Sequence, residues 1–490
     1  MSLAKVKTVA FEGINAIGID IQVHIGTGLP AFNIVGMAHK SVAEAKDRIR
    51  AVLNTVGISM PAKRITVNLS PADIIKEGSH YDLAIALGLL AAMKVIPESS
   101  IENSIIIGEL GLDGSIKPTP GSIMAGLLAK KTEKNLICEF SSAKEASLIG
   151  DIRIIPFKHI LECISFLKGE CNIESPQSAE IEEEEYDIDF KDVFGQELSK
   201  RALEIAAAGS FHILMIGPPG VGKSMIAKRM PTIMPKLSIK EAIEITMIYS
   251  VANKLKNGAL IMKRPFRDPH HSASLPALVG GGSKALPGEI SLAHNGILFL
   301  DELGEYSKAL EGLRQSMETQ EISIARAQSH VTYPAKSQIV AAMNPCKCGY
   351  FGTPKQCKRA PACAQEYQSK ISGPILDRFD LIINIEKEND LSFCNKNSET
   401  SKDIQKRIEK AINFQKENFG SKDISSMPIE NLNISEESFD LLLLFCKKNQ
   451  ISRRGLVKIS RVARVIANLE EKLEISKNHI LEAIRYKVVL

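Results

Sequence analysis

Residues 213–224 read ILMIGPPGVGKS, four apolar residues followed by a glycine-rich octapeptide. The octapeptide has the spacing G-x-x-x-x-G-K-S and consists of Gly217, Pro218, Pro219, Gly220, Val221, Gly222, Lys223 and Ser224. A strand before this spacing and a helix-like continuation at residues 225–229 predict a P-loop, whose backbone N–H groups wrap phosphates at the positive end of the helix. Lys223 would neutralise the β- and γ-phosphates and Ser224 would ligate Mg²⁺. The predicted cofactors are therefore ATP and Mg²⁺, and the alternative of a glycine-rich turn entering a core helix is disfavoured by the complete motif.

A second apolar strand, at residues 297–300, lies in the segment 296–302, which reads GILFLDE and ends in two carboxylates. Such an ending is commonplace alone, but downstream of a P-loop it predicts a hydrolytic site. Asp301 would hold the Mg²⁺ shell and Glu302 would polarise the attacking water. We therefore expect ATP hydrolysis and not a nucleotide held only for structure.

The composition is that of an ordinary globular protein. The chain has 490 residues, 44% of them hydrophobic and 24% charged, which predicts two to four domains. A formal charge of +4 is too small to mark the whole chain as a nucleic-acid binder. The longest apolar run, Leu83–Met93, is 11 residues, whereas a membrane span needs about 20. With no signal-peptide pattern at the N-terminus, we expect a cytoplasmic protein without a membrane partner.

The pattern of residues predicts three domains and a linker. Residues 1–171 alternate strands with amphipathic stretches and predict a small α/β domain, with strands at 17–23 and 64–69 and a helix at 41–56. Residues 172–188 carry Ser, Pro, Gln and a run of Glu and predict an acidic, solvated linker.

The remaining chain predicts two further domains. Buried-looking strands at 213–216, 297–300 and 339–343 predict a parallel sheet covered on both faces, within a domain at 189–387. Leu- and Ile-rich stretches at 435–445 and 457–473 predict a helical domain at 388–490.

Several segments resemble the AAA+ ATPases of the magnesium-chelatase-like group, and specifically its ComM/YifB type of competence-related proteins. These segments are Asp192–Gln196, Arg264–His271, Pro287–His294, Ala342–Cys346 and Ser372–Asp380. The resemblance runs the length of the chain. It implies an AAA+ core at 189–387 and a helical lid at 388–490.

The resemblance also implies roles for three further residues. Asn344 matches the sensor-1 residue that orients water, Arg378 resembles the arginine finger that reaches a neighbouring subunit, and Arg454 looks like the sensor-2 arginine. From the sequence alone, Arg378 could instead pair with Asp377 or Asp380 in its own chain. A finger acting in trans requires a homo-oligomeric ring, and related motors suggest a hexamer.

Four of the nine cysteines fall within 18 residues and offer enough thiolates for a tetrahedral metal site. They are Cys346, Cys348, Cys357 and Cys363. The first pair resembles the family's Asn-Pro-Cys-Pro-Cys-Gly segment, although Lys347 replaces the usual proline. We predict structural Zn²⁺, with free thiols as the alternative and redox catalysis less favoured.

The N-terminal segments 67–73, 76–78 and 108–114 resemble the Lon-protease-like domain, of the ribosomal S5 domain 2-like fold. The loop that carries the nucleophile in Lon enzymes here reads Ser79-His80-Tyr81-Asp82, and residues 120–123 offer no activating lysine. Nucleophilic catalysis needs a hydroxyl and a positioned base, so we predict a catalytically degenerate domain without peptidase activity. Oligomerisation or DNA contact is the expected use.

The ComM resemblance implies a DNA substrate. It suggests a helicase that promotes branch migration in natural transformation or general recombination, working with recombination proteins. Arg326 and Lys336 flank a predicted hairpin that faces the ring pore in related ATPases, where cations would track phosphates. The competing interpretations are a magnesium-chelatase motor subunit, a protein-remodelling ATPase and a non-enzymatic scaffold.

Overall fold

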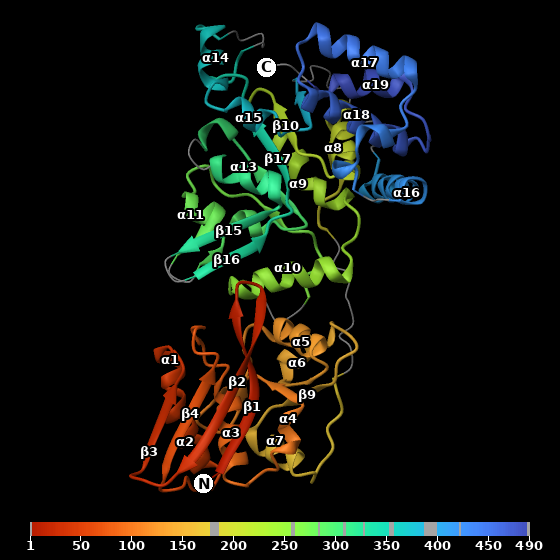
Figure 1. The fold of residues 1–490 in the computed structure, drawn as a ribbon. Coiled ribbons are helices and arrows are strands. Elements are labelled where there is room, and N and C mark those ends of the chain that lie inside the picture. Colours follow the sequence, from red (N-terminus) through yellow and green to blue (C-terminus); the bar gives the residue numbers. More distant parts are fainter. Residues whose placement is uncertain are drawn as a thin grey trace. The chain divides into compact units, whose positions relative to one another are not determined.

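The computed structural model describes residues 2–176, 186–255, 260–282, 285–306, 310–326, 329–351, 357–386, 399–420 and 423–487. Most of the predicted linker, residues 177–185, lies outside this set. The chain forms two compact units, Met1–Glu183 with Ile239–Met262 and Glu184–Ser238 with Lys263–Leu490 (Figure 1). Among the described residues, no helix has the length and apolar character needed to cross a membrane.

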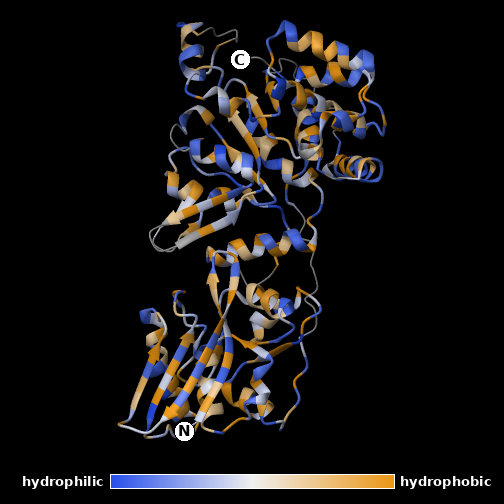
Figure 2. Cartoon of the chain, viewed as in Figure 1, coloured by the Kyte–Doolittle hydropathy of each residue, from blue (hydrophilic) through white to orange (hydrophobic). Residues whose placement is uncertain are grey.

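The first unit is built on a seven-stranded mixed sheet. Its order is β3 (Ala31–Val35), β4 (Arg64–Ser70), β2 (Asn15–Gly26), β1 (Ser2–Glu12), β5 (Ser104–Ile106), β8 (Asn135–Glu139) and β9 (Ile154–Phe157). The β1–β2 and β2–β4 pairs are antiparallel and the other pairs are parallel. Figure 2 shows hydrophobic and hydrophilic residues interleaved along the long strands, as expected when alternate side chains face a core. The predicted strands at 17–23 and 64–69 lie within β2 and β4.

Helix α3 (Asp82–Ala92) is the centre of this unit's core, and every one of its residues is buried. It corresponds to the longest apolar run of the sequence. The helix predicted at 41–56 is instead two helices, α1 (Lys40–Ala43) and α2 (Ala45–Thr55), separated at Glu44. Apolar periodicity continues through Glu44, so the pattern alone does not reveal the break. The remaining elements are α4 (Ser99–Glu102), β6 (Glu109–Leu110), β7 (Ile116–Lys117), α5 (Ser122–Lys131), α6 (Phe140–Ser147) and α7 (Ile160–Leu167).

Helix α10 (Ile239–Val251) belongs to the first unit although it follows the P-loop helix in the chain. Its Met247 is buried with Ile123 and Met124 of α5. The Ser250 hydroxyl accepts a hydrogen bond from the Gly121 N–H at 3.3 Å. Part of the sequence between the P-loop and Asp301 therefore packs with the N-terminal sheet.

The second unit contains a five-stranded sheet in which every pair is parallel. Its order is β11 (Phe266–Arg267), β14 (Ile297–Leu300), β17 (Gln338–Met343), β10 (Ile213–Ile216) and β18 (Leu381–Asn384). All residues of β10, β14 and β17 are buried, which explains their continuous apolar sequences. The predicted parallel α/β core is thus confirmed.

Helices surround this sheet and follow it. Around the sheet lie η1 (Phe190–Asp192), α8 (Glu197–Gly209), α9 (Lys223–Ile233), α11 (Leu275–Val279), α12 (Glu289–Leu292), η2 (Leu303–Glu305), α13 (Leu310–Thr319), α14 (Ala362–Gln368) and α15 (Gly373–Leu376). Two hairpins join β12 (Gly280–Gly281) to β13 (Leu286–Pro287) and β15 (Glu321–Arg326) to β16 (Ser329–Pro334). The C-terminal elements are α16 (Ser401–Phe419), η5 (Ile424–Ser426), η6 (Ile429–Leu432), α17 (Glu436–Lys448), α18 (Arg453–Leu469) and α19 (Lys477–Arg485).

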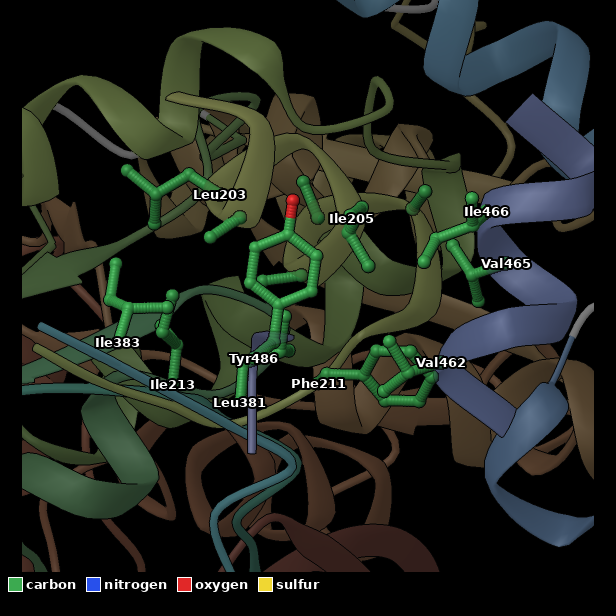
Figure 3. Packing of buried hydrophobic residues seen from close by; sticks show 14 of the residues in the cluster. Leu203, Ile205, Phe211, Ile213, Leu381, Ile383, Val462, Val465, Ile466 and Tyr486 are labelled. Carbon is green, nitrogen blue, oxygen red and sulfur yellow. The ribbon is translucent and has the colours of Figure 1, made fainter. Parts of the chain in front are cut away.

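One hydrophobic cluster joins the sheet to the C-terminal helices. Figure 3 shows side chains of α8, β10, β18 and α18 gathering around Tyr486 and Phe211. Because this core is continuous, α18 has a fixed position relative to the strands that carry the nucleotide motifs.

Candidate active site

Three adjacent strands bring the predicted nucleotide-binding residues to one edge of the sheet. β10 runs into the P-loop, β14 into Asp301 and Glu302, and β17 into Asn344. These strands are neighbours in the order β14-β17-β10, and all pairs are parallel. Carboxyl ends of parallel strands meet at the same edge, where open α/β sheets bind their ligands.

The P-loop has the backbone conformation that its glycines permit. Gly220 and Gly222 have φ values of 81° and 89°, and a side chain at either position would be strained. Helix α9 starts at Lys223 with Gly222 as its N-cap and with no side-chain cap bond. The first-turn N–H groups therefore remain for an anionic ligand at the positive end of the helix.

Lys223 is held between the P-loop and the end of β17. Its Nζ donates to the carbonyl oxygens of Gly217 at 2.7 Å and Pro218 at 2.9 Å, and to Asn344 Oδ1 at 3.2 Å. Burial lowers the pKa of Lys223, and the carboxylates of Asp301 and Glu302 oppose that shift. The structure thus places Asn344 in direct contact with the P-loop lysine.

Ser224 and Asp301 lie together as the predicted Mg²⁺ ligands require. The Ser224 hydroxyl donates to Asp301 Oδ2 at 2.8 Å. One hydroxyl and one carboxylate suit Mg²⁺, which takes few protein oxygens and completes its shell with water and phosphate. The donor set of this edge therefore fits Mg·ATP.

Glu302 has a left-handed backbone, with φ of 54°, which is uncommon for a residue other than glycine. Its carboxylate is half-exposed, and Oε2 lies 3.2 Å from His271 Nδ1. Residues held in such conformations cluster at functional sites. The arrangement leaves one carboxylate accessible to solvent beside the buried Lys223.

Two residues of this site received no role from the sequence. His271 contacts Glu302, and its ring packs against His270 with centroids 4.1 Å apart and an interplanar angle of 33°. Burial raises the pKa of Asp268, and Lys228 opposes that shift. His271 and Asp268 both lie in the Arg264–His271 segment that supported the family resemblance. The sequence therefore marked this segment but did not show that it lies at the nucleotide site.

Arg378 is buried, with 4% of its surface exposed, and it forms an ion pair with Glu318 of α13. Arg454 Nη2 lies 3.9 Å from the same Glu318 carboxylate. The alternative partners expected from the sequence were wrong, because Asp380 pairs with Lys458 at 2.9 Å and Arg378 turns to α13 instead. The fold therefore brings the two predicted arginines together across one carboxylate.

The four clustered cysteines converge, with all Sγ atoms within 4.8 Å of one another. Cys346 is buried, Cys348 is exposed and Cys357 is half-buried. The Phe351 N–H donates to Cys346 Sγ at 3.3 Å. A tetrahedral zinc site with Zn–S bonds near 2.3 Å has sulfur atoms about 3.8 Å apart, so these donors fit a metal of that kind.

The loop at 79–82 does not form a nucleophile and base pair. The Ser79 hydroxyl donates to Glu109, whereas His80 Nε2 bonds the Val9 carbonyl oxygen at 2.9 Å inside the core. Serine and histidine thus have separate partners.

The predicted pore hairpin corresponds to β15 and β16, paired in antiparallel register. Its tip, residues 327–328, and the side chain of Arg326 lie outside the described residues.

Profiles of three families match the chain. The profile described as magnesium chelatase, subunit ChlI matches residues 189–392. A profile for subunit ChlI of Mg-chelatase matches residues 21–141, and a profile for the ChlI C-terminal region matches residues 398–487.

Whole-length relatives agree with these profiles. The uncharacterised protein YifB of Salmonella typhimurium is 40% identical over 503 residues, covering 100% of this chain and 98% of the relative. The competence protein ComM of Haemophilus influenzae is 39% identical over 503 residues with the same coverage. The DNA helicase MCM8 of Bos taurus is 26% identical over 207 residues, or 39% of this chain and 22% of the relative.

Proposed function

Because this chain belongs to the magnesium-chelatase-like AAA+ ATPase family of YifB and ComM, we propose that it is a ring-shaped motor acting on DNA. The proposed activity is that of a helicase that promotes branch migration in recombination or natural transformation. The observation that carries the proposal is the 39% identity to a competence protein over the whole chain. The weaker similarity to the DNA helicase MCM8 points to the same substrate class.

The proposed catalytic roles follow from the contacts at the sheet edge. Lys223 is desolvated and held by Asn344, so its charge is available at the phosphates without competing water. Ser224 and Asp301 would hold Mg²⁺, which supplies charge neutralisation at the phosphates when bound. Glu302 would orient and deprotonate the attacking water, and its contact with His271 would fix the carboxylate.

Arg378 is proposed to act in the nucleotide site of a neighbouring subunit, with Arg454 in the sensor-2 role. In this conformation Arg378 pairs with Glu318, so the trans role requires Glu318 to release it. Glu318 is half-exposed, so water can solvate its carboxylate once Arg378 leaves. A homo-hexameric ring is the proposed assembly.

The other parts of the proposal follow from the sequence resemblance. The first unit would be a degenerate Lon-protease-like domain, the C-terminal helices a lid, and the cysteine cluster a Zn²⁺ site. We further propose a cytoplasmic location and recombination proteins as partners.

The decisive experiment measures steady-state ATPase activity with no DNA and with single-stranded, duplex and four-way-junction DNA. Glu302→Gln and Arg378→Ala serve as inactive controls. The helicase proposal predicts strong stimulation by at least one DNA and its loss in both variants. Branch-migration and strand-displacement assays would then identify the reaction.

A second candidate is a magnesium-chelatase-like motor subunit or a protein-remodelling ATPase. The three family profiles, all described by a chelatase subunit, favour keeping it. ATPase activity that is equal with all three DNAs and without DNA would overturn the helicase proposal in favour of this candidate.

A further inference from the structure

The four-cysteine cluster is joined to the ATP site through β17. Cys346 follows Asn344 by two residues, and Asn344 Oδ1 accepts the 3.2 Å hydrogen bond from Lys223 Nζ. The backbone between them turns at once from the sheet into the cluster. Any movement of Cys346 is therefore transmitted to the residue that holds the P-loop lysine.

Residues 346–350 carry the first two cysteines and form a turn that packs directly on the P-loop. Gly349 has a φ of 80°, and a Cβ atom there would lie only 2.7 Å from Cδ of Pro219. A glycine is required at this place both by the backbone conformation and by the close approach. The turn that carries Cys346 and Cys348 thus forms one wall of the phosphate-binding loop.

The last cysteine reaches the other side of the same site through α14. Cys363 lies in α14, whose Tyr367 ring is so close to Gly304 that a Cβ there would come within 3.0 Å of it. Just after α14, Lys370 Nζ lies 3.1 Å from Glu305 Oε1. Both contacts are on η2, which follows Glu302 without a break.

The segment that makes these contacts has little core of its own. Among the described residues, its buried cluster consists of Cys346, Cys363 and Ala364, with Cys357 packed against them. Three sulfur atoms and one methyl group bury little apolar surface, and a hydrogen bond from Gln368 Nε2 to the Pro345 carbonyl oxygen at 3.3 Å adds one direct link between α14 and the loop. A metal bound by the thiolates would supply a further cross-link.

We infer that Cys346, Cys348, Cys357 and Cys363 bind one Zn²⁺ whose presence holds the ATP site together, so that ATP binding depends on this metal. The zinc site clamps the P-loop through Gly349, Asn344 through Cys346, and the Asp301–Glu302 loop through α14. The inference rests on the proposed function only in requiring that the chain binds ATP. It is independent of the DNA substrate.

The first test measures the metal itself in the purified full-length protein. Elemental analysis should find about one zinc per chain in the wild type and in Cys171→Ser, whose cysteine is exposed and outside the cluster. Cys348→Ser should contain little. Cobalt substituted into the wild type should give the thiolate charge-transfer and tetrahedral absorption bands, and Cys348→Ser should not.

The second test measures the dissociation constant of a fluorescent ATP analogue in the absence of DNA. Stripping the zinc with a chelator, or Cys348→Ser, should weaken binding about tenfold or more, the loss expected when one hydrogen bond to a charged group is released. Readdition of Zn²⁺ should restore the affinity of the stripped wild type. Circular dichroism of each sample shows whether the fold survives.

A third variant separates metal binding from the effect of the metal on the ATP site. It also covers the case in which Cys348→Ser does not fold. Gly349→Ala retains all four thiols, so it should keep its zinc but bind the analogue more weakly because the added methyl group displaces Pro219. Gly420→Ala is the matched control. It has a comparable φ of 70° with nothing within 4 Å of the added atom, and should bind as the wild type does.

Three results would overturn the inference. The first is a protein that neither purifies with zinc nor takes it up, and the second is iron in place of zinc in the cluster. The third is an affinity for the ATP analogue that stays unchanged both after zinc is removed and in Gly349→Ala. None of these bears on DNA stimulation, so failure here and failure of the proposed function are distinguishable.

Discussion

The trans role proposed for Arg378 makes a prediction about mixing two inactive variants. Arg378→Ala keeps its own P-loop lysine, and Lys223→Ala keeps its arginine. Each variant alone should lose ATPase activity about a thousandfold or more, the usual effect of an arginine finger or P-loop lysine. In a ring assembled from an equal mixture, about one interface in four pairs an intact lysine with an intact arginine. The mixture should therefore recover about a quarter of the wild-type activity.

The exposure of Arg378 and Glu318 determines how much the Arg378→Ala substitution lowers the free energy of unfolding. Arg378 is 4% exposed, but its partner Glu318 is 46% exposed in its side chain and can take up water when the arginine is lost. Breaking the pair should therefore destabilise the chain by about 1–3 kcal/mol, less than the loss of a fully buried pair. Glu318→Gln is the matched control, since it breaks the same ion pair and leaves Arg378 in place. It should retain ATPase activity.

The assay is steady-state phosphate release from the single variants and from their mixture, after conditions that allow subunits to exchange. Light scattering records whether each sample assembles. If the mixture assembles but is only as active as the sum of its components, Arg378 acts within its own subunit and the reasoning fails.

Three further predictions follow from the described contacts. Glu302→Gln should lower kcat about 10²- to 10⁴-fold with ATP affinity retained, because the carboxylate is half-exposed and contributes mainly to water activation. Glu311→Gln, in α13 and paired with Arg314 at 3.2 Å, should keep its activity, and equal losses in both variants would contradict the assignment of the base. Burial lowers the pKa of His80 to about 4, below its unfolded value near 6.5, so its contribution to the stability of the first unit should be fully present above pH 6.5 and be lost as the pH falls toward 4. Urea unfolding at pH 7.5 and pH 5 measures this, and a pH dependence that persists unchanged in His80→Asn would assign it to other groups. Gln338→Met removes the donor to two main-chain carbonyls at 2.8 and 2.6 Å and should cost about 2–4 kcal/mol by chemical denaturation. An unchanged unfolding midpoint would show that water replaces the lost donor.

Much of the nucleotide site could be predicted from sequence because its elements are local. The P-loop joins a buried strand to a helix within a few residues, and Asp301 and Glu302 directly follow another buried strand. Both strands were predicted with the bounds that the structure gives them, since continuous apolar runs are typical of central parallel strands. The break at Glu44 was missed because periodicity does not record where a helix is interrupted.

The pairings of side chains were beyond the reach of the sequence. Lys223 and Asn344 are 121 positions apart and meet because β17 lies beside β10, a neighbour relation that follows from the burial of the whole sheet. Arg378 pairs with Glu318, 60 positions away, and not with the two aspartates near it, and its guanidinium also donates to the Pro374 carbonyl oxygen of α15.

By itself, the sequence determined a P-loop core with two carboxylates and a group of cysteines close enough to share one metal. Local spacing suffices for these features, since each is set by the backbone over a few residues. Only the tertiary structure decided that α10 packs with the N-terminal sheet, that both arginines meet one glutamate, and that the cysteine turn touches the P-loop. Those contacts depend on strand order and on the burial of distant surfaces, which no local pattern records.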